Sequence, residues 1–79
     1  MTIRVQFFSK LRDLHGPDTL ELPENANVGM ALAELERRLP LLSHWNGKIL
    51  IAVGVEFAPR DQVLRENDLL SVMPPVQGG

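Results

Sequence analysis

Cysteine is absent from this chain, and aromatic residues make up only 5% of it. The lack of thiols excludes a disulfide framework, a thiolate metal site and a cysteine nucleophile. Any sulfur that passes through the protein must therefore be held by another group. Because aromatic side chains are scarce, we expect an interior of leucine, valine and isoleucine, in which the few large pieces are Phe7, Phe8, Trp45 and Phe57.

The chain also lacks an excess of one charge. Eight basic and ten acidic residues give a net charge of -2, and they are scattered without a run, so the basic stripe that nucleic-acid binding needs is missing. No apolar stretch approaches the roughly 20 residues of a membrane-spanning helix, and the first residues look like a strand and not like a targeting segment. At 79 residues we expect one cytoplasmic domain that binds neither nucleic acid nor membrane.

Alternating apolar and polar residues predict a first strand over Thr2 to Ser9. Phe8 falls on the polar face of this strand, where it either packs under a loop or docks a partner. Leu11 and Leu14 predict a short helical turn over Lys10 to His15 that ends at Gly16. A second strand is predicted over Thr19 to Leu22.

One helix is predicted from Val28 to Leu39. Asn27 is a favourable N-cap residue, and Pro40 removes the backbone donor that would continue the helix. Apolar residues repeat at helical spacing on one face, at Ala31, Leu32, Leu35 and Leu39. Glu34 and Arg38 stand on the other face at a spacing that allows an ion pair.

Three strands are predicted after the helix. The nearly continuous apolar run from Lys48 to Val53 predicts a central strand that is covered on both faces. Val55 to Phe57 suits a short edge strand, and Leu69 to Met73 suits the last strand. The resulting order predicts an α+β fold of the β-grasp (ubiquitin-like) type, in which one main helix crosses a mixed sheet of about five strands and the first and last strands run parallel at its centre.

The last six residues follow the final strand without any apolar or polar period, which predicts a domain over 1–73 and a tail over 74–79. Pro74 and Pro75 favour an extended exit, so the tail could project roughly 18 Å from the body. Gly78 and Gly79 can enter a channel that is too narrow for a Cβ atom. An idle, frayed chain end is the ordinary alternative, but two prolines followed by bare glycines favour a probe with a reactive tip.

With these residues the chain resembles the family of molybdopterin synthase small subunits, which are sulfur carriers of the ubiquitin-like and thiamine sulfur carrier superfamily. The resemblance runs through four segments, Ile3 to Phe8, Leu11 to Gly16, Gly47 to Val53 and Pro74 to Gly79. The Pro-Pro-Val-x-Gly-Gly ending is the specific signal, because the other segments are typical of ubiquitin-like folds.

The resemblance implies a cycle in which an activating enzyme similar to ubiquitin E1 uses ATP to adenylate the Gly79 carboxylate. A sulfur donor protein then displaces AMP, which leaves a covalent thiocarboxylate (1-thioglycine) at Gly79. The large synthase subunit accepts this tip, and the sulfur is donated to cyclic pyranopterin monophosphate in molybdenum cofactor biosynthesis. The resemblance therefore implies no stably bound cofactor, no enzyme activity of the chain on its own, and a heterotetramer of two small and two large subunits.

The resemblance also assigns candidate site residues. The reactive end is Gly79 with Gly78, and partners would contact Phe8, Arg12, Phe57, Met73, Pro74, Pro75, Val76 and Gln77. Simple packing at the strand end is an equal alternative for Met73. His15 and His44 stand far apart in the sequence, so no metal site is expected.

Three other functions stay open from the sequence. The chain could carry sulfur for thiamine or another sulfur-bearing product. It could be a ubiquitin-like protein modifier whose Gly79 forms isopeptide bonds with lysines. It could also be a plain β-grasp interaction module, in which case loss of Gly78 and Gly79 would leave its function intact.

Overall fold

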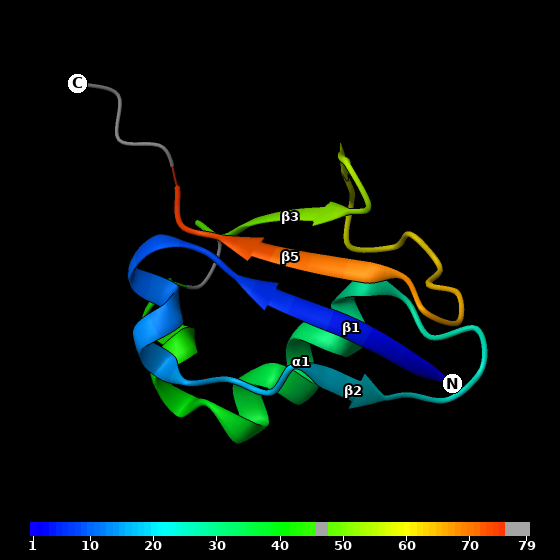
Figure 1. Cartoon of the computed structure of the whole chain (residues 1–79), viewed down its shortest axis with the longest axis horizontal. Coiled ribbons are helices and arrows are strands. Elements are labelled where there is room, and N and C mark those ends of the chain that lie inside the picture. Colours follow the sequence, from blue (N-terminus) through cyan, green and yellow to red (C-terminus); the bar gives the residue numbers. More distant parts are fainter. Residues whose placement is uncertain (46–47, 76–79) are drawn as a thin grey trace.

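Within residues 1–45 and 48–75, which are the residues it describes, the computed structural model contains five strands, one α-helix and two short 3-10 helices. Along the chain they are β1 (Thr2–Phe7), η1 (Ser9–Leu14), β2 (Thr19–Glu21), α1 (Val28–Arg38), η2 (Pro40–Trp45), β3 (Leu50–Val53), β4 (Glu56–Phe57) and β5 (Leu69–Met73). The strands form one sheet, and α1 lies behind it in the view of Figure 1. The expected α+β, β-grasp arrangement is confirmed.

The strands lie in the order β2-β1-β5-β3-β4. β1 and β5 run parallel, with Val5 opposite Leu70 and Phe7 opposite Val72, and the other neighbouring pairs are antiparallel. The prediction that the first and last strands pair in parallel is therefore confirmed. β5 occupies the centre of the sheet.

The prediction that the apolar run before Gly54 forms the central strand is wrong. β3 lies between β5 and the two-residue β4, so it is the second strand from an edge. Ile51 is buried toward the core, whereas Leu50 and Ala52 point to the opposite face, next to Met73 and Ser71 of β5. A continuous apolar run shows only that a strand has apolar side chains on both faces. In β3, one of these faces is not covered by a helix.

Helix α1 follows its sequence signals closely. The Asn27 side-chain oxygen accepts a hydrogen bond from the Met30 backbone N–H at 2.8 Å, and the Leu39 N–H donates to the Leu35 carbonyl at 2.7 Å just before Pro40. Residues on one face of the helix are buried against the sheet, namely Val28, Ala31, Leu32 and Leu35. The core therefore lies between α1 and one face of the sheet.

The aromatic residues divide between the core and the surface. Phe7 and Trp45 pack against the core as expected. Phe8 and Phe57 do not, because 38% and 72% of their surfaces are exposed. Each lies on the face of the sheet opposite α1, since successive side chains of a strand point to opposite faces. The expectation that all the large aromatic residues fill the interior is thus wrong for these two.

The predicted helical turn after β1 is confirmed as η1, but it does not end through Gly16. His15 closes it in the left-handed conformation, with φ of 53°, and its backbone N–H donates to the Arg12 carbonyl at 3.1 Å. Gly16 is needed for a different reason, because a Cβ atom there would lie 2.3 Å from the Phe7 ring. The glycine allows the aromatic ring to pack directly on the backbone.

The hairpin between β3 and β4 turns at Gly54 and Val55. Gly54 has φ of +65°, a left-handed angle that glycine adopts without steric cost. Val55 is not one of the described residues with a positive φ. Of the two central residues of the turn, only the first therefore has a positive φ. This turn places the Val55 side chain at the tip of the hairpin, where it is 99% exposed.

Candidate functional site

The face of the sheet opposite α1, here called the open face, carries a set of apolar side chains. Strand register aligns Gln6, Ser71, Ala52 and Phe57 in one row across β1, β5, β3 and β4. Met73 and Leu50 stand opposite each other in the next row. Phe8 continues β1 beside this row, because its backbone N–H donates to the Val72 carbonyl at 3.0 Å.

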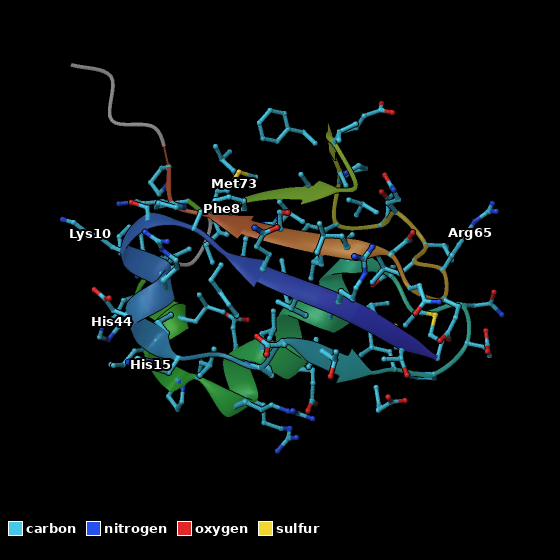
Figure 2. All side chains as sticks on the ribbon, in the orientation of Figure 1. Phe8, Lys10, His15, His44, Arg65 and Met73 are labelled. Carbon is cyan, nitrogen blue, oxygen red and sulfur yellow. The ribbon has the colours of Figure 1, made fainter. Side chains whose placement is uncertain are left out.

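Four of these residues, Phe8, Met73, Leu50 and Phe57, form what we call the apolar strip. Phe8 and Phe57 are exposed, while Leu50 and Met73 are half-buried. Figure 2 shows Phe8 and Met73 close together at the end of β5. Exposed aromatic side chains beside a partly exposed methionine are typical of surfaces that bind another protein. The strip is therefore the best candidate docking surface on this face.

The predicted C-terminal site begins at one end of the strip. β5 ends at Met73, and the half-buried Pro74 and Pro75 follow it at the end of the sheet where η1 also lies (Figure 1). The other predicted tail residues, Val76, Gln77, Gly78 and Gly79, lie outside the described residues. A chain that leaves β5 here starts next to Phe8, so a protein that covers the strip is adjacent to the base of the tail.

The predicted docking residues are not all at one point. Phe8 and Met73 are neighbours, whereas Phe57 lies on the other side of β3, toward the sheet edge. Arg12 is exposed on η1, in the 3-10 turn that begins after Phe8. The candidate surface is thus an extended apolar strip with Arg12 of η1 near one end. The docking roles of these residues stay predictions.

Sequence reasoning missed two apolar residues that are at least partly accessible, Leu50 and Val55. Leu50 belongs to the strip, and Val55 is exposed at the tip of the β3–β4 hairpin. The signal for Leu50 was present, because Ile51 and Val53 share the period of inward-facing residues and therefore place Leu50 and Ala52 on the opposite face. The signal for Val55 was the glycine before it, which marks a hairpin tip.

The titratable groups give no sign of an acid-base or metal site on the described part of the chain. Within residues 1–45 and 48–75, no three His, Asp or Glu side chains cluster in a way that could hold a metal ion. The pKa of Glu34 is lowered to about 2, because Arg37 and Arg38 hydrogen-bond to its carboxylate and add favourable charge. Glu34 belongs to α1, on the other side of the sheet from the strip.

None of the described helices has the length and apolar character that crossing a membrane requires.

Comparisons with known proteins find similar sequences over nearly the whole chain. Residues 5–79 match the ThiS family. The molybdopterin synthase sulfur carrier subunit of Arabidopsis thaliana is 30% identical, over 98% of this chain and 82% of that protein. The corresponding subunit of Escherichia coli is 33% identical, over 98% of this chain and 99% of that protein.

Solved structures share the fold over almost the whole chain. Molybdopterin converting factor subunit 1 of Pyrococcus furiosus superposes with a TM-score of 0.85 at 28% identity, and covers 96% of this chain and 99% of its own. SAMP1 of Haloferax volcanii superposes with a TM-score of 0.84 at 26% identity over the full length of both chains. A chain of the complex between subunits 1 and 2 of the molybdopterin-converting factor from Helicobacter pylori, at 24% identity and a TM-score of 0.68, shares the fold.

Proposed function

The chain belongs to the ThiS family and is a sulfur carrier of the molybdopterin synthase type, and we propose that the carboxylate of Gly79 is the group that carries the sulfur. One observation supports this choice of group above the others. The polypeptide leaves the central strand β5 at Pro74, beside an exposed apolar strip, and its sequence then runs to two glycines without a side chain. A partner that binds the strip thus has the start of the tail beside it.

The proposed chemistry needs activation, because a carboxylate is a poor electrophile. An enzyme similar to ubiquitin E1 transfers AMP from ATP to the Gly79 carboxylate and releases pyrophosphate. A sulfur nucleophile from a donor protein then attacks the acyl carbon and expels AMP, which leaves a thiocarboxylate on Gly79. The thiocarboxylate sulfur is ionised and polarizable at neutral pH, as thiolates are, so it is a good nucleophile.

The second half of the cycle takes place in the large synthase subunit. The sulfur of Gly79 attacks a carbon of cyclic pyranopterin monophosphate and displaces an oxygen substituent, so a C–S bond forms as a C–O bond breaks. Water then cleaves the acyl–sulfur bond that links carrier and substrate. The sulfur stays on the pterin, and Gly79 returns to a carboxylate. Two transfers of this kind supply the two sulfurs of a dithiolene. General acids and bases for these steps would belong to the large subunit.

The exposed apolar strip supports the docking roles that we propose. Phe8, Phe57 and Met73 would contact the large subunit through the strip, with Arg12 at one end. Pro74 and Pro75 would guide Val76, Gln77 and Gly78 into its active site. We place the division between a docking body and a delivery tail at residues 1–73 and 74–79. The assembly proposed is two small and two large subunits, in the cytoplasm.

A second candidate function is protein modification. SAMP1 has the same fold over its full length, and its name describes a modifier. The same activated Gly79 could in principle form an amide with a lysine amine in place of a thiocarboxylate. Higher-mass conjugates that disappear when Gly78 and Gly79 are deleted would support this function.

The deciding experiment is incubation of the purified chain with ATP, an activating enzyme and a sulfur donor, followed by mass analysis of the fragment after Arg65. This fragment contains Met73, and methionine oxidation adds almost the same mass as exchange of oxygen for sulfur. Alkylation with iodoacetamide separates the two, because it adds to a thiocarboxylate and leaves a sulfoxide unchanged. A chain without Gly79 is the matched control.

An alkylatable sulfur located on Gly79 by fragmentation supports the carrier function. An unmodified Gly79, in the presence of an activating enzyme that does modify a known carrier, contradicts it.

A further inference from the structure

Met73 brings a sulfur atom into the apolar strip. It is the last residue of β5, and it stands opposite Leu50 of β3. On its other side, the parallel register pairs Phe7 with Val72, so the next residue of that strand, Phe8, lies beside Met73. Figure 2 shows the Met73 sulfur on the side of β5 away from the helices. A thioether therefore lies between Phe8 and Leu50 in the proposed docking surface.

The three methionines of the chain differ in their surroundings. Because the chain has no cysteine, their thioethers are the sulfur atoms that an oxidant meets before a thiocarboxylate is formed. All three lie within the described residues. Met1 packs against the core, and Met30 is 46% exposed on α1, in the other layer of the fold. Met73 is half-buried and lies on the open face.

A chemical change at the Met73 side chain would spare the core. Its neighbour Val72 is fully buried, and successive side chains of a strand point to opposite faces of the sheet. Val72 therefore faces α1, whereas Met73 faces away from it. The end of β5 is held by the backbone, since the Phe8 N–H donates to the Val72 carbonyl at 3.0 Å. A polar group on Met73 would thus alter the strip and leave the core packing and this strand pairing in place.

Oxidation makes such a polar group, because it converts the flexible apolar thioether into a sulfoxide. In the free chain, water can hydrogen-bond to the sulfoxide oxygen, since Met73 is partly exposed. Under a docked partner, the same oxygen would be buried beside Phe8 and Leu50, whose side chains have no hydrogen-bond donor. Burial of an unpaired polar group is unfavourable, so the oxidised chain should dock more weakly.

We propose that Met73 is an oxidation site through which peroxide reversibly weakens docking of the carrier to the large subunit. The proposal rests on the proposed function, because it takes the strip as the surface that contacts this subunit. The Met73 sulfur attacks one oxygen of hydrogen peroxide, so an S–O bond forms as the O–O bond breaks and the other oxygen leaves as water. The sulfur loses two electrons and the peroxide gains them. A methionine sulfoxide reductase reverses the change with two electrons from a dithiol, and the oxygen leaves as water.

Calorimetric titration of the large subunit with the unloaded carrier, before and after peroxide treatment, tests this switch. Mass analysis of the fragment after Arg65 measures how much Met73 is oxidised. We expect the oxidised chain to bind about tenfold more weakly or worse. Treatment with the two methionine sulfoxide reductases, one for each epimer, should restore the affinity. The urea unfolding curve should change little, because the core is untouched.

Met73→Leu is the matched control. Leucine has a similar volume and no sulfur, so this variant should bind within about threefold of the unchanged chain and keep its affinity after peroxide treatment. It retains Met1 and Met30, so any effect of their oxidation would still appear. Met73→Gln places a polar side chain at the same position without an oxidant, and it is expected to weaken binding about as much as the sulfoxide does.

Three results would overturn the proposal. If peroxide oxidises Met30 completely and leaves Met73 intact, the Met73 sulfur is out of reach. If the chain binds equally well with Met73 fully oxidised, the sulfoxide is not buried in the complex. If oxidised Met73→Leu loses as much affinity as the oxidised unchanged chain, the effect arises elsewhere. In each case the proposed function stands when the untreated chain binds the large subunit and accepts sulfur at Gly79, and an untreated chain that does neither contradicts both.

Discussion

Truncation of Phe57 is expected to separate docking from folding. This side chain is 72% exposed in the free chain, so most of its surface is still available to a partner. A phenylalanine buries about 200 Å² when fully covered, which leaves about 140 Å² for the interface. At about 25 cal/mol per Å², covering that area is worth about 3.5 kcal/mol before the alanine that replaces it is counted. We expect Phe57→Ala to cost about 2 to 3 kcal/mol of binding, or about 30- to 150-fold in Kd.

The effect of the same change on folding should be smaller. The covered part of the ring amounts to about 60 Å², which corresponds to at most about 1.5 kcal/mol of folding free energy. Urea unfolding measures this loss, and calorimetric titration of the large subunit measures the first. A matched control is Leu41→Ala, because Leu41 is 59% exposed but belongs to η2, away from the open face. Its binding is expected to stay within about twofold of the unchanged chain.

Two results would refute this reasoning. If Phe57→Ala binds the large subunit as tightly as Leu41→Ala does, the strip does not extend across β3 to the sheet edge. If instead the loss of folding free energy exceeds the loss of binding, Phe57 is a structural residue despite its exposure.

Three further predictions concern stability. Glu34→Gln should flatten the acid side of the pH profile of thermal unfolding. Because the pKa of Glu34 is lowered to about 2, its contribution to stability is present above the usual carboxyl range and is lost as the pH falls toward 2. An unchanged slope in the variant would contradict this. Gly16→Ala should lower the free energy of unfolding in urea by about 1 to 3 kcal/mol, because the Phe7 ring must move. The added change Phe7→Leu should recover part of this loss. Strictly additive effects of the two changes would contradict the contact. Gly54→Val should lower the melting temperature, and Gly54→Asn should lower it less, because asparagine tolerates a φ of +65°. Equal losses in the two variants would argue against a conformational cause.

The elements themselves were predictable because their local signals agree with the tertiary fold. Asn27 caps α1, Pro40 follows its end, and Ile3 and Val5 alternate with exposed residues along β1. Strand order was less accessible. The residues of β3 are apolar on both faces. A central strand and a strand with an uncovered apolar face have this same sequence pattern. Only the pairing with β4 shows which case applies.

The site divides in the same way. A tail of two prolines and two glycines is visible in the sequence, and so is the mismatch of Phe8 with the polar face of β1. The contact between the Phe7 ring and Gly16 was not visible, because it depends on packing between separate segments. Gly16 reads as a helix terminator, yet His15 takes that conformation and Gly16 is needed for the approach of Phe7. No local pattern distinguishes a glycine that turns the chain from one that makes room for a ring.

A sheet with an uncovered apolar face carries a hazard, because a second copy can add to its edge and extend the exposed apolar surface. The edges of this sheet limit that outcome. β2 has three residues and β4 has two, and each contains an exposed glutamate, Glu21 in one and Glu56 in the other. Short, charged edge strands offer few free backbone groups to a second copy. The chain therefore exposes Phe8 and Phe57 without presenting a long edge for self-association.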